Sequence, residues 1–123
     1  MQDFRNLKVW QKAHALTLDV YRSTREFPIE ERYGLTNQLR RSCASVPANL
    51  AEGCARWSNI DFARFVNNAA GSASETDYHL LLARDLDYLS EPIYVPLFEQ
   101  ISEVKRMLNA FERTLRGNDK LSG

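Results

Sequence analysis

Several features that mark common classes of protein are missing from the sequence. The five glycines are dispersed, so there is no glycine-rich loop of the kind that cradles phosphate, and neither a CxxC nor an HExxH motif occurs. No apolar run approaches the roughly 20 residues that span a bilayer. The opening MQDFRNLKVW also lacks the basic and apolar regions of a signal peptide. We therefore expect a cytoplasmic protein without a membrane anchor.

The sequence has little cysteine. Cys43 and Cys54 are eleven residues apart in a predicted helix, which at about 1.5 Å of rise per residue separates them by roughly 16 Å along the axis. A disulfide requires Cα atoms within about 7 Å of each other. We expect two buried, reduced thiols.

An excess of charge of one sign is also missing. Sixteen Lys and Arg side chains balance sixteen Asp and Glu side chains, so the net charge gives no argument for a nucleic acid, a membrane or an acidic substrate as partner. Residues 1–56 carry a net charge of +3 and residues 57–123 a net charge of −3. This is a mild dipole and not a basic arm.

The pattern that is present is helical. Apolar residues recur at steps of three and four in four segments, at about 6–26, 35–54, 59–88 and 92–116. Ser58 is placed to cap the third segment, which should form the longest helix, and Pro92 suits the first turn of the fourth. Gly53 and Gly117 are placed to close helices. We predict an all-α protein: one antiparallel up-down-up-down four-helix bundle over residues 1–117, with a flexible tail at 118–123.

Pro47 interrupts the apolar stripe of the second predicted helix. A proline inside a helix removes one hydrogen bond and crowds the carbonyl four residues before it, here that of Cys43. Because the stripe continues in phase beyond Pro47, we predict one bent helix rather than two. Ser42, Ser45, Asn49 or water are the local candidates to donate to the freed carbonyl. Replacing Pro47 by Ala should preserve helicity and weaken assembly.

The first and third predicted helices are apolar beyond the single stripe that a bundle needs. Such excess predicts a second contact surface and hence a homo-oligomer, although aromatic tips can also cover loops. The helical wheel does not fix the subunit number. The residues assigned to this interface are Leu7, Trp10, Leu18, Tyr21, Tyr78 and Leu82.

Candidates for catalysis or metal binding are few. Glu75 and His79 are four residues apart on one predicted helix and could form half of a metal site, with Asp85 or Glu52 completing it. Cys43 could act as a nucleophile with His79 as its base, but burial in the apolar stripe would raise the pKa of the thiol. A hydrogen bond or salt bridge explains the Glu75 and His79 spacing equally well. We predict no enzyme, no cofactor and no metal, with a metal-dependent or thiol enzyme as the alternative.

Four arginines and a tryptophan fall near the second helix and the turn that follows it. Guanidinium groups bind phosphate, and an indole can stack on a base. The same arginines can instead pair with carboxylates such as Glu52, Asp61 or Glu75. The residues considered for contact with nucleic acid or a partner are Arg40, Arg41, Arg56, Trp57 and Arg64.

Three linked blocks carry a family resemblance: FRNLKVWQKAHALTLDVY, YGLTNQLRRSCASVPANLAEG and FARFVNNAAGSASET. Over about residues 4–116 the chain resembles the "four helix bundle protein" family, which is encoded in intervening sequences of bacterial 23S rRNA genes and is often labelled S23 ribosomal protein. Cys54 and Trp57 depart from its usual residues. The residues at the family's characteristic positions are Arg40, Arg41, Asn49, Glu52, Gly53, Gly71, Ser72 and Glu75.

The resemblance implies an antiparallel four-helix bundle that assembles as a homopentamer and is not an enzyme. A related branch comprises accessory proteins of diversity-generating retroelements, which form a pentameric barrel whose basic residues engage nucleic acid and a reverse transcriptase. Taken together, these features predict a non-enzymatic pentameric scaffold that contacts RNA, DNA or a nucleic-acid enzyme through its arginines. A purely structural assembly without nucleic acid is the rival prediction.

Overall fold

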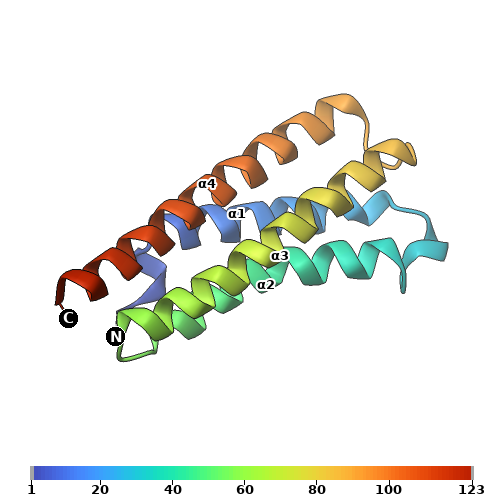
Figure 1. Ribbon diagram of the computed structural model, residues 1–123. Helices are drawn as coiled ribbons and strands as arrows, with labels where there is room; N and C mark the ends of the chain where they lie inside the picture. The colour runs from blue at the N-terminus through green and yellow to red at the C-terminus, as the bar shows by residue number, and fades with distance from the viewer. Residues whose placement is uncertain (1, 123) are drawn as a thin grey trace.

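The computed structural model of the protein describes the backbone of residues 2–122 and the side chains of residues 2–117 (Figure 1). Four helices dominate it: α1 (Lys8–Ser23), α2 (Leu35–Cys54), α3 (Asn59–Asp85) and α4 (Glu91–Ser122). Three short 3-10 helices, η1 (Phe4–Asn6), η2 (Thr24–Glu26) and η3 (Ile29–Glu31), lie beside α1 and before α2. The described residues contain no strand, so the predicted all-helical class is confirmed.

The helices pack as a bundle in which α2 and α4 each contact both α1 and α3. The helices α1 and α3 therefore lie across a diagonal, and the chain reverses direction at each short connection (Figure 1). The predicted apolar stripes meet along the bundle axis. Among the side chains that are almost completely buried are Leu16, Val20, Leu39, Val46, Leu50, Val66, Leu80, Ile101, Val104 and Leu108. None of the described helices has both the length and the apolar character of a membrane span.

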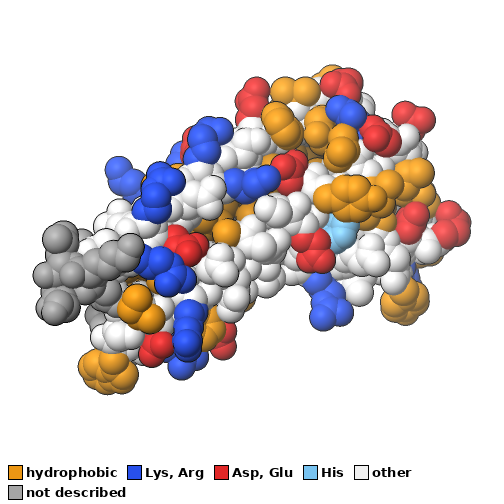
Figure 2. All heavy atoms as spheres, in the orientation of Figure 1, with side chains coloured by type: hydrophobic (Ala, Val, Ile, Leu, Met, Phe, Trp, Pro, Cys, Tyr) orange, Lys and Arg blue, Asp and Glu red, His pale blue; other side chains and the backbone are white. Residues whose placement is uncertain are grey.

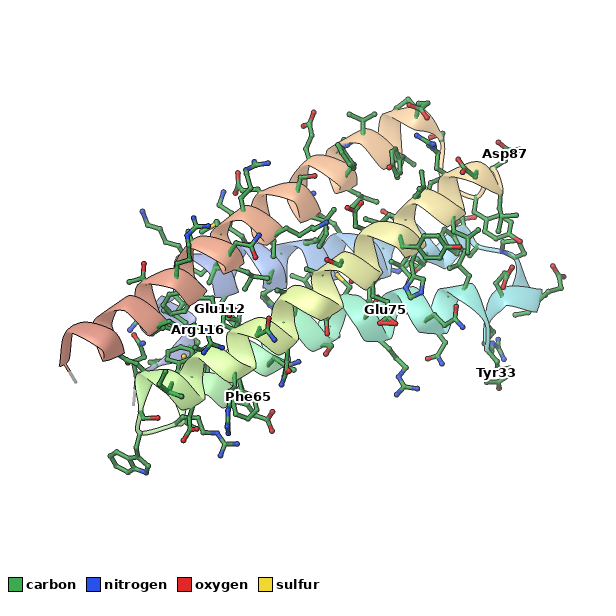
Figure 3. All side chains as sticks on the ribbon, in the orientation of Figure 1. Tyr33, Phe65, Glu75, Asp87, Glu112 and Arg116 are labelled. Carbon is green, nitrogen blue, oxygen red and sulfur yellow. The ribbon has the colours of Figure 1, made fainter. Side chains whose placement is uncertain are left out.

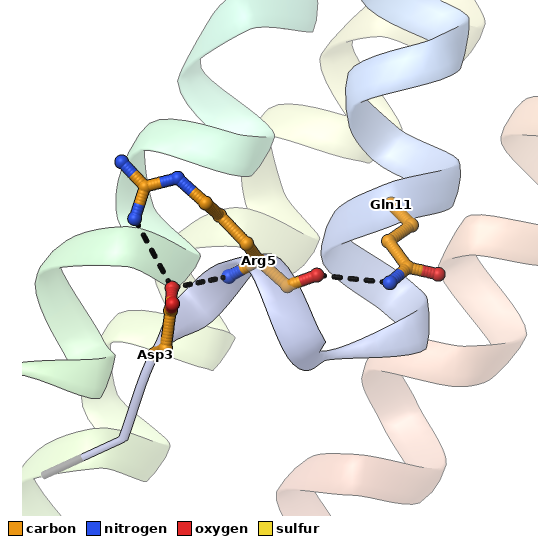
Figure 4. Close-up of polar contacts among 3 residues, drawn as sticks. All are labelled: Asp3, Arg5 and Gln11. Carbon is orange, nitrogen blue, oxygen red and sulfur yellow. Dashed lines mark hydrogen bonds and ion pairs between the residues drawn. The ribbon is translucent and has the colours of Figure 1, made fainter.

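The N-terminal segment is fixed to α1 by local hydrogen bonds (Figure 4). The Asp3 carboxylate accepts from the backbone amide of Arg5 at 3.0 Å and from its guanidinium at 3.1 Å. The backbone hydrogen bond from Arg5 lowers the pKa of Asp3. The side-chain amide of Gln11 donates to the carbonyl of Arg5 at 2.8 Å. These contacts set the ring of Phe4 against Trp10, with centroids 5.0 Å apart, so η1 closes one end of the core.

Helix boundaries follow the predicted signals in two places. The Ser58 hydroxyl accepts from the Asp61 amide at 3.0 Å and caps α3. Pro92 lies in the first turn of α4. Gly53, however, does not close α2 in a left-handed conformation, because it lies inside the helix and no described glycine has a positive φ. The prediction that Gly53 closes the helix is wrong. The absence of a side chain at Gly53 instead allows α3 to approach α2 closely.

The third helix ends at Asp85 and not at Tyr88 as predicted. Asp87 adopts a left-handed φ of 63°. The Tyr88 amide donates to the carbonyl of Ala83 at 2.9 Å, and the Asp87 amide donates to that of Arg84 at 2.9 Å. This pair of bonds is the Schellman motif that closes many helices, with aspartate where glycine is usual. The sequence prediction missed it because it lacks the glycine signal.

The fourth helix runs through Gly117 to Ser122, so Gly117 does not end it and α4, not α3, is the longest helix. A helical glycine costs only about 1 kcal/mol relative to alanine, which does not by itself stop a helix. The flexible tail at 118–123 stays a prediction, because the backbone is helical to Ser122 and the side chains of these residues lie outside the described part of the chain.

Pro47 is buried inside a continuous α2. The group facing the carbonyl of Cys43 is not one of the predicted local donors. It is the Thr17 hydroxyl of α1, whose single proton is shared between the carbonyl of Ala13 at 2.8 Å and that of Cys43 at 3.4 Å. Asn49 instead donates to the carbonyl of Ser45. The bend at Pro47 remains a prediction.

Candidate interaction surfaces

The six residues assigned to an oligomer interface fall into two groups on opposite sides of the bundle, because α1 and α3 lie across the diagonal. Leu18 and Tyr21 of α1 are each 42% exposed, and Tyr78 of α3 is 58% exposed. The other three, Leu7, Trp10 and Leu82, are half-buried against the core of the same subunit. The structure therefore leaves three of the six largely accessible.

An aromatic ridge runs along the outer side of α1. Trp10 stacks on His14, with ring centroids 4.8 Å apart, and Tyr21 lies beneath the guanidinium of Arg40 at 4.7 Å. Beyond Arg40, the outward side of α2 carries four small side chains at helical spacing, next to the exposed Arg41 and Glu52. The small side chains are the half-buried Ala44 and Ala51 and the exposed Ala48 and Ala55. The aromatic ridge and the alanines form one smooth surface, here called the α1–α2 face.

The five residues considered for nucleic-acid contact are not brought together. Arg40 donates to Thr24 Oγ1 at 2.8 Å and to the carbonyl of Tyr21 at 3.3 Å, so it ties α2 to α1. Arg41 follows it on an exposed position. Arg56 lies past the other end of α2, and a rise of about 1.5 Å per residue separates it from Arg40 by roughly 20 Å or more. The arginines that lie close to α2 in the sequence are therefore far apart along the axis of that helix.

At the α2–α3 turn the remaining three residues do lie together. Trp57 is 89% exposed at the tip of the turn. The guanidinium of Arg56 covers the ring of Phe65 at 4.4 Å, and Arg64 is 3.7 Å from the Asp61 carboxylate. A tryptophan this exposed is unusual on a free surface, because the indole has a large apolar area.

The zero net charge hides a strong asymmetry along the bundle axis. Residues 16–44 and 73–103, here called the acidic half, carry eleven carboxylates against six Lys and Arg side chains. Residues 2–15, 45–72 and 104–117, the basic half, carry nine Lys and Arg against four carboxylates. The acidic half thus has a net charge of −5 and the basic half a net charge of +5. In Figure 2 the blue side chains gather toward the half that holds the α2–α3 turn, and red ones toward the other. Figure 3 marks Glu75, Asp87 and Tyr33 in the acidic half and Phe65 and Arg116 in the basic half.

A polar seam joins α2 and α3 beside the core. Ser42 Oγ lies 3.1 Å from His79 Nδ1 and 3.0 Å from the Thr76 hydroxyl. One turn away, the Ser72 hydroxyl donates to Ser45 Oγ at 3.0 Å. A groove of about 330 Å³ opens over the seam and is lined by residues that include Arg41 and Glu75. The serines could have been found from their spacing at the edge of the apolar stripes.

The seam gives no support to the metal or thiol alternative. Among the described side chains, no three His, Cys, Asp or Glu residues lie close enough together to hold a metal ion. Burial lowers the pKa of His79, opposed by the charge of Glu75, and so favours the neutral imidazole. Burial raises the pKa of the Cys43 thiol to about 11, and the Thr17 hydroxyl lies 3.7 Å from its sulfur. Both cysteines are free and buried, as predicted.

Comparison with known proteins agrees with this architecture. Residues 5–110 match the family described as 23S rRNA-intervening sequence protein. A crystal structure of a protein with unknown function from the S23 ribosomal protein family of Bacteroides thetaiotaomicron superposes with a TM-score of 0.77 at 23% identity, covering 85% of this chain and 98% of that one. No curated protein matches. The chain belongs to the 23S rRNA-intervening sequence protein family, and its helical fold is similar to that of the Bacteroides protein.

Proposed function

We propose that the protein is a non-enzymatic scaffold of the cytoplasm that assembles as a ring of identical subunits and presents its basic ends to RNA or DNA. The observation that carries the assembly is the pair of apolar surfaces on opposite sides of one bundle, around Tyr21 on α1 and around Tyr78 on α3. Two different surfaces that meet head to tail form a closed ring when the rotation between subunits closes. The resemblance to the family supplies the expected subunit number of five.

A ring arranges the charges of the subunits in a particular way. Rotation about a single axis keeps like ends on the same side when the bundles lie along that axis. The basic halves, each with a net charge of +5, would then form one basic rim. Phosphate affinity grows with the number of charges that are neutralised, so a rim binds a polyanion far better than one subunit does.

Within the basic half, Arg56, Trp57 and Arg64 are the residues we assign to nucleic acid. The exposed indole of Trp57 can stack on an unpaired base, and the flanking guanidinium groups can reach phosphate. Arg40 is left out because two hydrogen bonds to Thr24 and Tyr21 hold its guanidinium against the end of α1, whereas the ion pair of Arg64 with Asp61 is long, at 3.7 Å, and exposed. Arg41 is left out because it belongs to the acidic half.

Replacing Tyr78 by Ser should shift the protein to smaller species, because it removes the most exposed aromatic side chain from the α3 surface. Light scattering at micromolar concentration measures the result. Tyr33→Ser is the matched control, since Tyr33 is 87% exposed beyond η3 and belongs to neither surface. A wild-type protein that is monomeric under these conditions would end the ring proposal.

Binding to single-stranded RNA should weaken steeply between 50 and 200 mM salt, because the contact is made mostly to phosphate. Fluorescence anisotropy of a labelled RNA of twenty nucleotides measures the affinity. Removing both nearby guanidinium groups with Arg56→Gln and Arg64→Gln should cost about tenfold, a typical loss for two phosphate contacts. Arg41→Gln serves as the control and should change little. A salt-independent affinity, or an equal loss with Arg41→Gln, contradicts the assigned site, and no binding at 50 mM salt favours a purely structural assembly.

A further inference from the structure

One apolar surface of the acidic half is used neither by the bundle core nor by the two surfaces of the proposed ring. Val95 and Phe98 lie three residues apart on the outer side of α4 and are 40% and 42% exposed. The ring of Phe98 stacks on that of Tyr94, with centroids 5.9 Å apart, and Tyr94 in turn lies under the guanidinium of Arg84 from α3 at 4.9 Å. Tyr94 itself is buried and belongs to the core, so Val95, Phe98 and Arg84 are the residues called here the α3–α4 face. Figure 2 shows hydrophobic side chains gathered over this end of the two helices.

Carboxylates surround the α3–α4 face. Burial raises the pKa of Tyr94, and the charges of Asp77, Asp85 and Glu91 raise it further against the opposing effect of Arg84. The two cations at this surface are already committed. Arg84 pairs with Asp85 at 3.0 Å, and Lys105 pairs with Asp77 at 3.1 Å. Of the three carboxylates, only Glu91 lies outside these two ion pairs. The negative charge that an incoming group meets therefore comes from Glu91 and from the net charge of −5 of the acidic half, beside the exposed ring of Phe98.

The acidic half exposes more large apolar side chains than the basic half does. Of the eleven large hydrophobic side chains described as exposed, nine belong to the acidic half and two, Trp57 and Ile60, to the basic half. Large apolar patches on a soluble surface commonly mark a site of interaction. Negative charge around such a patch selects for a partner of opposite charge and repels nucleic acid.

We propose that the α3–α4 face docks a cationic amphipathic helix of a second protein. The two antiparallel helices offer a surface on which a third helix can lie, with its apolar positions against Val95 and Phe98. Lysine and arginine side chains at the edges of that helix reach Glu91 and share Asp85 with Arg84, while their stems cover apolar surface. Contact of this face with itself in another copy is disfavoured, because it would oppose like charges.

The probe for this site is a labelled 18-residue helical peptide of Leu and Lys, and its matched control is the same peptide with Glu in place of Lys. Anisotropy titration of the full chain should show binding of the Lys peptide only. Phe98→Ser should weaken it about tenfold, as expected for loss of a central aromatic contact. Ile60→Ser, which removes an equally exposed apolar side chain in the basic half, should change it less than twofold.

Further variants separate the contributions and guard against a folding defect. Val95→Lys should abolish binding by placing a positive charge against the cationic helix, and Glu91→Gln should weaken it and reduce its dependence on salt. RNA affinity should not change in Phe98→Ser, and peptide affinity should not change in Arg56→Gln, so this inference and the proposed nucleic-acid function fail separately. Equal binding of the Glu peptide, or unchanged binding in both Phe98→Ser and Val95→Lys, overturns the proposal. A changed subunit number in Phe98→Ser also overturns it, since the face would then be a contact between copies.

Discussion

Replacing Gly53 by Ala should lower the free energy of unfolding by about 1–2 kcal/mol, the usual cost of overpacking a close contact. A Cβ atom built on Gly53 would lie 2.7 Å from Cδ1 of Phe62 and 3.0 Å from Cβ of Phe65. The Phe62 ring is buried and packs edge-on against Phe111 at 5.2 Å, so it cannot swing aside. The Phe65 Cβ moves only with the backbone of α3. The two helices must therefore separate.

Gly71 provides the matched control for this prediction. It too is helical, but no atom lies within 4 Å of a Cβ added there. Gly71→Ala should therefore raise the free energy of unfolding by about 0.5–1 kcal/mol, through the better helix propensity of alanine. Urea unfolding followed by circular dichroism measures both variants at one protein concentration. Equal effects of the two substitutions would contradict the steric argument, and a destabilising Gly71→Ala would place a neighbouring subunit against this position.

The helices and the core follow directly from the sequence, because both depend on apolar spacing along one chain segment. Leu39, Val46 and Leu50 are buried where the stripe of the second helix predicts. Helix ends were less predictable. Glycine near the end of an apolar stripe predicts the end of a helix, yet Gly53 lies inside α2. The left-handed residue that closes α3 is Asp87. Local residue preference is weaker than the packing and the hydrogen bonds that decide these positions.

The surfaces were predicted less well, for a geometric reason. Arg40 lies near the start of α2 and Arg56 just after its end, so the length of that helix puts them in halves of opposite charge. The carboxylates around Tyr94, which are Asp77, Asp85 and Glu91, are distant in sequence from Arg40 and Arg56. The fold brings them to the same end of the bundle. Charge sums over consecutive residues cannot reveal such a distribution, since neighbouring antiparallel helices bring remote segments to the same end.

The contact between Thr17 and Cys43 shows the same dependence on remote segments. Pro47 has no amide hydrogen to donate to the carbonyl of Cys43, and the hydroxyl that faces this carbonyl comes from α1. Replacing Thr17 by Val keeps the shape of the buried side chain and removes its hydroxyl. We expect Thr17→Val to lower the free energy of unfolding by about 1–3 kcal/mol, the range for a buried polar group left without its partner.

A double-mutant cycle with Pro47→Ala tests this assignment. Alanine restores the amide that can donate to Cys43 within α2, so the hydroxyl of Thr17 is then less needed. Thr17→Val should cost about 1 kcal/mol less in the Pro47→Ala background than in the wild type, a coupling typical of groups in direct contact. Urea unfolding of the four proteins gives the coupling energy. A cost of Thr17→Val that is the same in both backgrounds would mean that the hydroxyl serves only the carbonyl of Ala13, to which it also donates at 2.8 Å.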